Sequence, residues 1–228
     1  MINQKKQGLL SRLLLGGAMM AILGGTMSFA ENGALLHSAV ANKDSQKVTE
    51  ILAKSVSNLD SRDYQARTPL MVATQQNNAQ IAKLLIEAGA DVNAKDGIQD
   101  TPYLLAGAQG YNEILELTLA HGANIKDTNR YGGTAIIPAA EKGHLETVKI
   151  LLKAGLDPNQ INNLGWTALM EAVILGNGSA RYVEIVKTLI DGGADPNIPD
   201  KRGTTPLTHA KNRGDQAMVD LLLLHGAK

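Results

Sequence analysis

The stretch TAIIPAAEKGHLETVKILLKAGLDPN, residues 134–159, contains the pattern that decides the fold. It opens with a short Ala-rich segment and turns at Gly143. Apolar residues then recur at helical spacing, at Val148, Leu151 and Leu152. Gly155 follows this second segment, where a residue in the left-handed conformation closes a helix. The stretch therefore predicts two short helices joined by a turn.

The same marks return along the chain at a nearly constant interval. A Thr-led motif recurs every 33 residues and once after 38, at Thr68-Pro69-Leu70, Thr101-Pro102-Tyr103, Thr134-Ala135-Ile136, Thr167-Ala168-Leu169 and Thr205-Pro206-Leu207. A Gly-led motif runs in step with it, at Gly89-Ala90-Asp91, Gly122-Ala123-Asn124, Gly155-Leu156-Asp157, Gly193-Ala194-Asp195 and Gly226-Ala227. One such unit cannot bury its apolar side alone, so we expect a stack of units that cover one another.

These motifs make the chain resemble the ankyrin-repeat family, whose pattern is T-P-L-H-x-A-A, G-H-x-E-I-V-x-L-L-L and G-A-D-x-N. The string Asn163-Leu164-Gly165-Trp166-Thr167 also resembles a bacterial subfamily. The resemblance implies an all-α, curved solenoid of about six helix-turn-helix units with β-turn or loop connections. The first helices and the loop tips would lie on its concave side. The approximate units are 31–62, 63–95, 96–128, 129–161, 162–199 and 200–228.

Two units depart from the pattern. The first is degenerate, because Ala34-Leu35-Leu36-His37-Ser38-Ala39 replaces the Thr-led motif, as is typical of a terminal repeat. The fifth has five extra residues, Asn177–Arg181, between Gly176 and a helix that we expect to begin near Val183. Asn-Gly-Ser favours a turn, so this insertion should protrude between the two helices as a loop.

Residues 1–30 have the pattern of a cleavable signal peptide. Lys5, Lys6 and Arg12 form a basic start, and an apolar run without charge follows from Leu13 to Met27. Ser28-Phe29-Ala30 then places small residues where a signal peptidase cleaves, so we expect cleavage after Ala30. An uncleaved anchor is the alternative, although the run is shorter than the roughly 20 residues of a spanning helix. We expect a periplasmic or secreted protein without membrane insertion after cleavage.

Composition argues against several functions. Without the leader, 19 basic residues face 22 acidic ones, a balance that does not favour nucleic acid. There is no cysteine, so disulfides and thiol chemistry are excluded. The five histidines have no metal-ligand spacing, and no catalytic motif is present. We interpret Glu141, Glu146 and Glu171 as solvated carboxylates, and we predict no enzyme, no cofactor and no metal.

The resemblance implies a partner surface made by the loop tips and the ends of the first helices. The tips offer Tyr64, Arg67, Arg130, Tyr131, Leu164, Trp166, Lys201 and Arg202, and the helix ends offer Gln75, Gln76, Glu141, Lys142, Ile174, Leu175, Asn212 and Arg213. Aromatic and Arg side chains dominate interface energetics, so we expect the surface to centre on the fourth and fifth units. Trp166 could bind a partner, pack on its own unit, or do both.

The function that we predict is a non-catalytic adaptor, scaffold or inhibitor that binds one unidentified protein, as a monomer. An immunity protein against a toxin, or a secreted effector that binds a host protein, is an alternative. An enzyme or a small-molecule binder with a site on the concave face is the alternative of another class, because a fold alone does not exclude a function.

Overall fold

The computed structural model describes residues 32–54 and 58–228. The predicted signal peptide and its cleavage site lie outside these residues. Within them the regular structure is helical, without strands, which confirms the all-α prediction. No helix of this part of the chain has the length and apolar character to cross a membrane.

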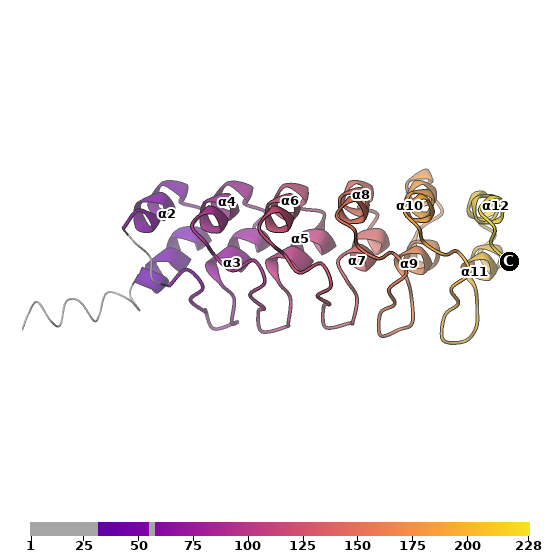
Figure 1. Cartoon of the computed structure of the whole chain (residues 1–228), viewed down its shortest axis with the longest axis horizontal. Helices are drawn as coiled ribbons and strands as arrows, with labels where there is room; N and C mark the ends of the chain where they lie inside the picture. The colour runs from indigo at the N-terminus through magenta and orange to yellow at the C-terminus, as the bar shows by residue number, and fades with distance from the viewer. Residues whose placement is uncertain (1–31, 55–57) are drawn as a thin grey trace, which may run out of the picture.

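The helices form two rows along one long stack (Figure 1). The first row holds the first helix of each unit, and the second row holds the second helix (Figure 1). Residues 32–41 are helical and pair with α2 (Ser45–Leu52). The next pairs are α3 (Pro69–Gln75) with α4 (Ala79–Glu87), α5 (Pro102–Gln109) with α6 (Asn112–Ala120), α7 (Ile136–Glu141) with α8 (Leu145–Lys153), α9 (Ala168–Leu175) with α10 (Ala180–Asp191), and α11 (Pro206–Asn212) with α12 (Gln216–Leu224).

Threonine side chains start most helices of the first row. The hydroxyl of Thr68 accepts a hydrogen bond from the backbone N–H of Met71, and Thr101, Thr167 and Thr205 cap their helices in the same way. Pro69, Pro102 and Pro206 occupy first helical positions, where the missing N–H has no partner to lose. Thr134 differs, because α7 starts two residues after it without a side-chain cap.

Glycine ends the second helices. Gly89, Gly122, Gly155, Gly193 and Gly226 all have positive φ, as the sequence predicts. The residue after each glycine donates its backbone N–H back into the helix, as Ala90 does to Leu85 at 3.0 Å. This closing motif satisfies carbonyl groups that a helix end would leave unpaired.

Apolar side chains between the two rows form one continuous core. Leu70, Ile81 and Leu85 are fully buried in the second unit, and Leu151, Leu169 and Leu189 are their counterparts further along. Small residues allow the first-row helices to approach closely. At Gly107, a Cβ atom would lie 2.8 Å from the Cβ of Ala135 in the next unit.

The loops between units project from the first row (Figure 1). Each is built around one Asp or Asn side chain. In the fifth unit, Oδ1 of Asn162 accepts the backbone N–H groups of Leu164 and Trp166 at 2.9 and 3.1 Å. Asp63, Asp96, Asn129 and Asp200 make the equivalent bonds in their own loops. The tips therefore have one shape along the stack and differ mainly in their side chains.

Asparagine side chains also tie successive units together at the ends of the second helices. Asn159 donates to the carbonyl of Gly193 at 3.0 Å, and its Oδ1 accepts the N–H of Asp195 at 2.8 Å. Asn93 and Asn197 make the same pair of bonds to the units that follow them. The Asn that follows three of the Gly-led motifs is therefore a bridge between neighbouring units.

The inserted segment of the fifth unit differs from the prediction. α10 begins at Ala180, not near Val183, so Ala180 and Arg181 belong to an added helical turn. The loop shrinks to Asn177, Gly178 and Ser179, in which Oδ1 of Asn177 accepts the N–H of Ser179. The helix extends because Tyr182 fixes its start, by donating a hydrogen bond to the carbonyl of Glu141 at 2.9 Å.

Candidate functional site

A hollow of about 530 Å³ lies on the first-row side of the third, fourth and fifth units. Its walls come from α5, α7 and α9 and from the loops that precede α7 and α9. Exposed apolar and aromatic groups line it, with Tyr131 59% exposed, Leu164 58% and Leu175 49%. Trp166 also lines it and is half-buried.

A buried carboxyl group, Glu171, forms part of this lining. It lies on α9, is only 4% exposed, and accepts a hydrogen bond from the Asn162 amide on Oε1 at 2.8 Å. Its second oxygen, Oε2, is buried and has no hydrogen-bond partner. Burial raises the pKa of Glu171 to about 7, the negative charge of Glu141 adds to the rise, and the Asn162 bond opposes it.

The other end of the hollow has its charges paired. Arg130 lies 3.6 Å from the carboxylate of Asp100, and its guanidinium stands over the Tyr131 ring at 4.6 Å from the centroid. Burial and the charge of Asp96 raise the pKa of Asp100, and Arg130 opposes this rise. Of the three acidic groups that line the hollow, Asp100 therefore has a basic partner, whereas Glu141 and Glu171 take part in no ion pair of the described residues.

The hollow brings together seven of the residues that the sequence predicts for the partner surface. They are Arg130, Tyr131, Glu141, Lys142, Leu164, Trp166 and Leu175. The half-buried state of Trp166 agrees with both roles considered for it, since its ring is partly covered and partly available.

Several other predicted residues are engaged inside the protein. Arg67 pairs with Asp63 at 2.7 Å and donates to Gln75 at 2.6 Å. Gln76 donates to the carbonyl of Ala41 in the preceding unit, and Arg213 donates to the carbonyls of Ile174 and Gly176. The contacts of Gln76 and Arg213 join neighbouring units, whereas those of Arg67 stay within its own unit.

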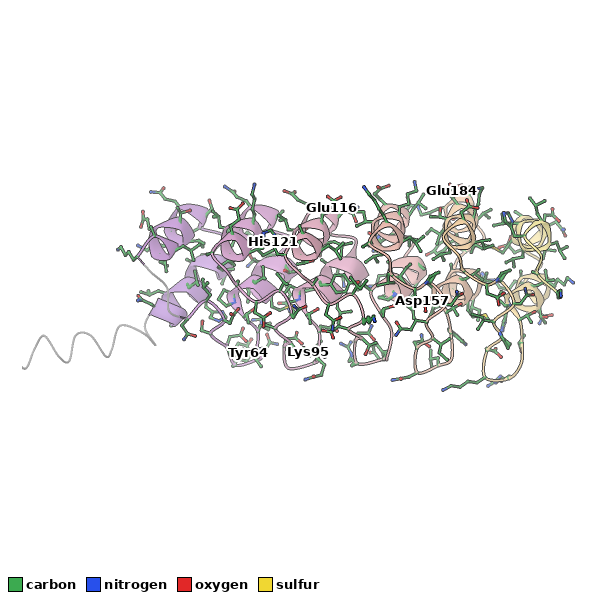
Figure 2. All side chains as sticks on the ribbon, in the orientation of Figure 1. Tyr64, Lys95, Glu116, His121, Asp157 and Glu184 are labelled. Atoms are coloured by element: carbon green, nitrogen blue, oxygen red, sulfur yellow. The ribbon has the colours of Figure 1, made fainter. Side chains whose placement is uncertain are left out.

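The remaining predicted residues lie at loop tips, away from the hollow. Tyr64 is 92% exposed and points away from the helices (Figure 2). Arg202 is exposed, and Lys201 reaches the carbonyl of Asn163 in the preceding loop.

The interpretation of Glu171 as a solvated carboxylate is wrong. The loop of its own unit folds over it and buries it, and its pKa is raised. Helical periodicity does not report which side chains the preceding loop covers. Asp100 and Pro138, which also line the hollow, were not singled out either.

Four of the five histidines contact other groups of the described part of the chain through a ring nitrogen. His121 and His225 each contact the carbonyl four residues earlier through Nδ1, at helix ends. His37 contacts the carbonyl of Ser61 at 2.8 Å, and His209 contacts Asp200 at 2.9 Å. Residues 32–54 and 58–228 contain no group of three acidic or His side chains that could hold a metal ion.

Comparison with known structures finds close relatives of this arrangement. An ankyrin repeat domain from Acinetobacter baumannii AYE is 59% identical, with a TM-score of 0.82 over 85% of this chain and 98% of that chain. A second structure, EF0377, described as an ankyrin repeat protein, is 44% identical, with a TM-score of 0.81 over 84% of this chain and 97% of that chain. The ankyrin repeat domain of Bcl-3, described as a unique member of the IkappaB protein family, is 28% identical, with a TM-score of 0.76 over 85% of this chain and 86% of that chain.

No curated protein matches the chain. The family model described as ankyrin repeats (3 copies) matches residues 5–96 and 103–200, which together exceed half of the sequence. The repeated motifs, the two-row stack and these matches agree with one another, and the chain belongs to the ankyrin repeat family.

Proposed function

We propose that this protein is a non-catalytic adaptor or inhibitor that holds one protein partner on the first-row side of its third to fifth units. Ankyrin repeats mediate protein–protein interactions, and the fold is known as a non-catalytic interaction module. The observation that supports this location is the hollow, where Tyr131, Leu164, Leu175 and Trp166 lie exposed or half-exposed side by side.

Physical reasons favour this surface over the rest of the stack. Aromatic side chains supply large contact area with little loss of conformational freedom, and they anchor many interfaces. The helices and hydrogen-bonded loops that carry them are ordered before binding, so little further ordering is required.

We further propose that the partner is met in the periplasm or outside the cell. The support is the basic start, the apolar run and the small residues at Ser28 and Ala30. Mass spectrometry of the protein purified from its own cells tests this point. A chain that begins at Glu31 supports export, and a chain that retains residues 1–30 contradicts cleavage.

Site-specific photocrosslinking in the source cells tests the binding surface. A benzophenone amino acid would replace Tyr131 in the hollow, or Glu184 on α10 in the second row, which points away from the stack (Figure 2). We expect one discrete adduct from position 131 and none from position 184. Equal labelling from both positions, or no adduct from position 131, would argue against this surface.

A matched variant tests the contribution of the side chains. Combined substitution of Arg130, Tyr131 and Trp166 by Ala should abolish capture of the crosslinked protein by the purified chain. Circular dichroism checks that the variant stays folded. If the variant captures the partner as well as the wild type does, the adaptor function remains supported and the hollow is rejected as its binding surface.

A further inference from the structure

We propose that the hollow receives a Lys or Arg side chain from an extended segment of the partner, with its cationic group at Glu171 and Glu141. The inference rests on the proposed function and names the chemistry that the partner presents.

The first observation is the incomplete bonding of Glu171. The Asn162 amide satisfies Oε1, whereas Oε2 is buried without a partner. Most buried polar atoms in folded proteins have a hydrogen-bond partner, so an unpartnered carboxylate oxygen in a surface hollow indicates a missing donor. A Lys or Arg head group supplies both the donor and the opposite charge.

The second observation is the lack of a cation at this carboxyl. Asp63, Asp100 and Asp200 are each paired with a basic side chain of the protein. Glu171 and Glu141 take part in none of the ion pairs of residues 32–54 and 58–228, although Glu141 adds repulsion at Glu171. A basic group from outside would relieve this repulsion.

The basic groups nearby have other contacts or point to solvent. Arg130 is held by Asp100 and by the Tyr131 ring at the far end of the hollow. On α11, which packs against α9, His209 contacts Asp200 and Arg213 contacts the carbonyls at the end of α9. Lys142, at the end of α7, is exposed, and the structure gives it no ion pair.

The walls of the hollow suit a long basic side chain. Trp166 and Leu175 can cover its methylene groups, because Lys and Arg bury their stems on apolar surface. The indole face can also attract the cation directly. Since Oε2 is covered in the unbound chain, contact requires a rotamer change in the lining, which is common at interfaces.

The repeat itself sets where the rest of the segment lies. Leu105, Pro138 and Glu171 occupy the same position in successive first-row helices, and all three line the hollow. Packed helices lie about 8–10 Å apart, and an extended chain advances about 3.3 Å per residue. An apolar side chain over Pro138 would therefore stand about three residues from the basic one.

A random twelve-residue peptide library displayed on phage provides the probe. It is selected at pH 7.5 on the protein as purified from its cells. We expect enriched peptides to contain Lys or Arg about three positions from an apolar residue. The affinities of the best peptides are then measured with the wild type, Glu171→Gln and Glu116→Gln.

Glu171→Gln is chosen because Gln keeps the size of the side chain and an oxygen for Asn162. We expect it to weaken binding about tenfold or more, as removal of one member of a buried charge pair does. Glu116→Gln, an exposed change on α6 in the second row, should leave the affinity within about twofold (Figure 2). Replacing the basic residue of the peptide by Gln should lower its affinity for the wild type. The same replacement should change its affinity for Glu171→Gln much less.

Affinity measured between pH 6 and pH 8 gives a second readout. A cation binds the ionised form of Glu171, so wild-type affinity should rise with pH across this range and the Glu171→Gln profile should lose that rise. A rise that persists in Glu171→Gln would assign the pH dependence to another group and overturn the inference.

Other outcomes separate this inference from the proposed function. Enriched peptides without a basic residue that still depend on Tyr131 would overturn the inference and keep the binding surface. Basic peptides bound equally by Glu171→Gln would also overturn it. A selection that enriches nothing rejects the inference, and the photocrosslinking at position 131 then decides the proposed function separately.

Discussion

Asn162 and Glu171 join the loop and the helix of the fifth unit through one buried hydrogen bond of 2.8 Å. Asn162 is 8% exposed and Glu171 is 4% exposed. The same Asn162 side chain holds the loop that carries Leu164 and Trp166. The position of the loop that carries Leu164 and Trp166 and the burial of the Glu171 carboxyl are therefore linked through the Asn162 side chain.

The first prediction concerns the pH dependence of stability. Because the pKa of Glu171 is about 7 in the folded chain and near 4.5 when exposed, the folded state binds the proton more tightly. The contribution of Glu171 to the free energy of unfolding is therefore most favourable below pH 4.5. It falls by up to about 3 kcal/mol as pH rises to 7. Urea unfolding at pH 5, 6, 7 and 8 measures it.

Glu171→Gln serves as the control, because it removes this titration and leaves the others in place. The unfolding free energy of Glu171→Gln should increase relative to that of the wild type as pH rises. At pH 8 we expect the variant to be more stable by about 1–2 kcal/mol, since its unpartnered amide offsets part of the gain. A difference that does not change with pH would contradict the raised pKa.

The second prediction concerns the bridges between units. Asn159→Ala removes the bonds to Gly193 and Asp195 and should lower the unfolding free energy by about 1–2 kcal/mol. Asn212→Ala, an exposed change at the end of α11, should stay within about 0.5 kcal/mol of the wild type. Chemical denaturation compares the two, and equal effects would show that the Asn159 bridge adds nothing.

The third prediction concerns the close approach of α5 and α7. Ala is normally preferred to Gly inside a helix, but at position 107 its Cβ would lie 2.8 Å from that of Ala135. We expect Gly107→Ala to destabilise the chain by about 1–3 kcal/mol. The double variant Gly107→Ala/Ala135→Gly should recover part of the lost stability, as measured by thermal unfolding. Equal destabilisation with and without the second change would mean that this contact is not the cause.

The fourth prediction separates structural from binding roles at two arginines. Arg213→Ala removes hydrogen bonds to the end of α9 and should cost about 1–2 kcal/mol. Arg202→Ala, at a loop tip where the side chain is exposed, should change stability by less than about 0.5 kcal/mol. Calorimetry of both variants checks the contrast, which fails if Arg202→Ala is the more damaging change.

Local signals in the sequence predict the start and the end of many helices. A Thr-Pro pair fixes a cap and a first helical position, as at Thr68 and Pro69, and both act within one turn. A Gly such as Gly155 ends a helix because it adopts positive φ without strain. Local signals did not predict the extra turn at Ala180, because the contact between Tyr182 and Glu141 joins residues of two units that are 41 positions apart in the sequence.

The sequence by itself determined the period and the two helices of each unit, because these follow from short-range caps and from helical spacing. Its resemblance to the ankyrin-repeat family implied the solenoid and the side on which the loop tips lie. It also pointed to Tyr131 and Trp166 as neighbours on one surface, because the repeat returns them to equivalent tips. Only the tertiary structure decided that Arg213 is held internally and that Glu171 is buried with one oxygen unpartnered. The first depends on a contact with the preceding unit and the second on the cover given by a loop, and neither leaves a periodic trace in the sequence.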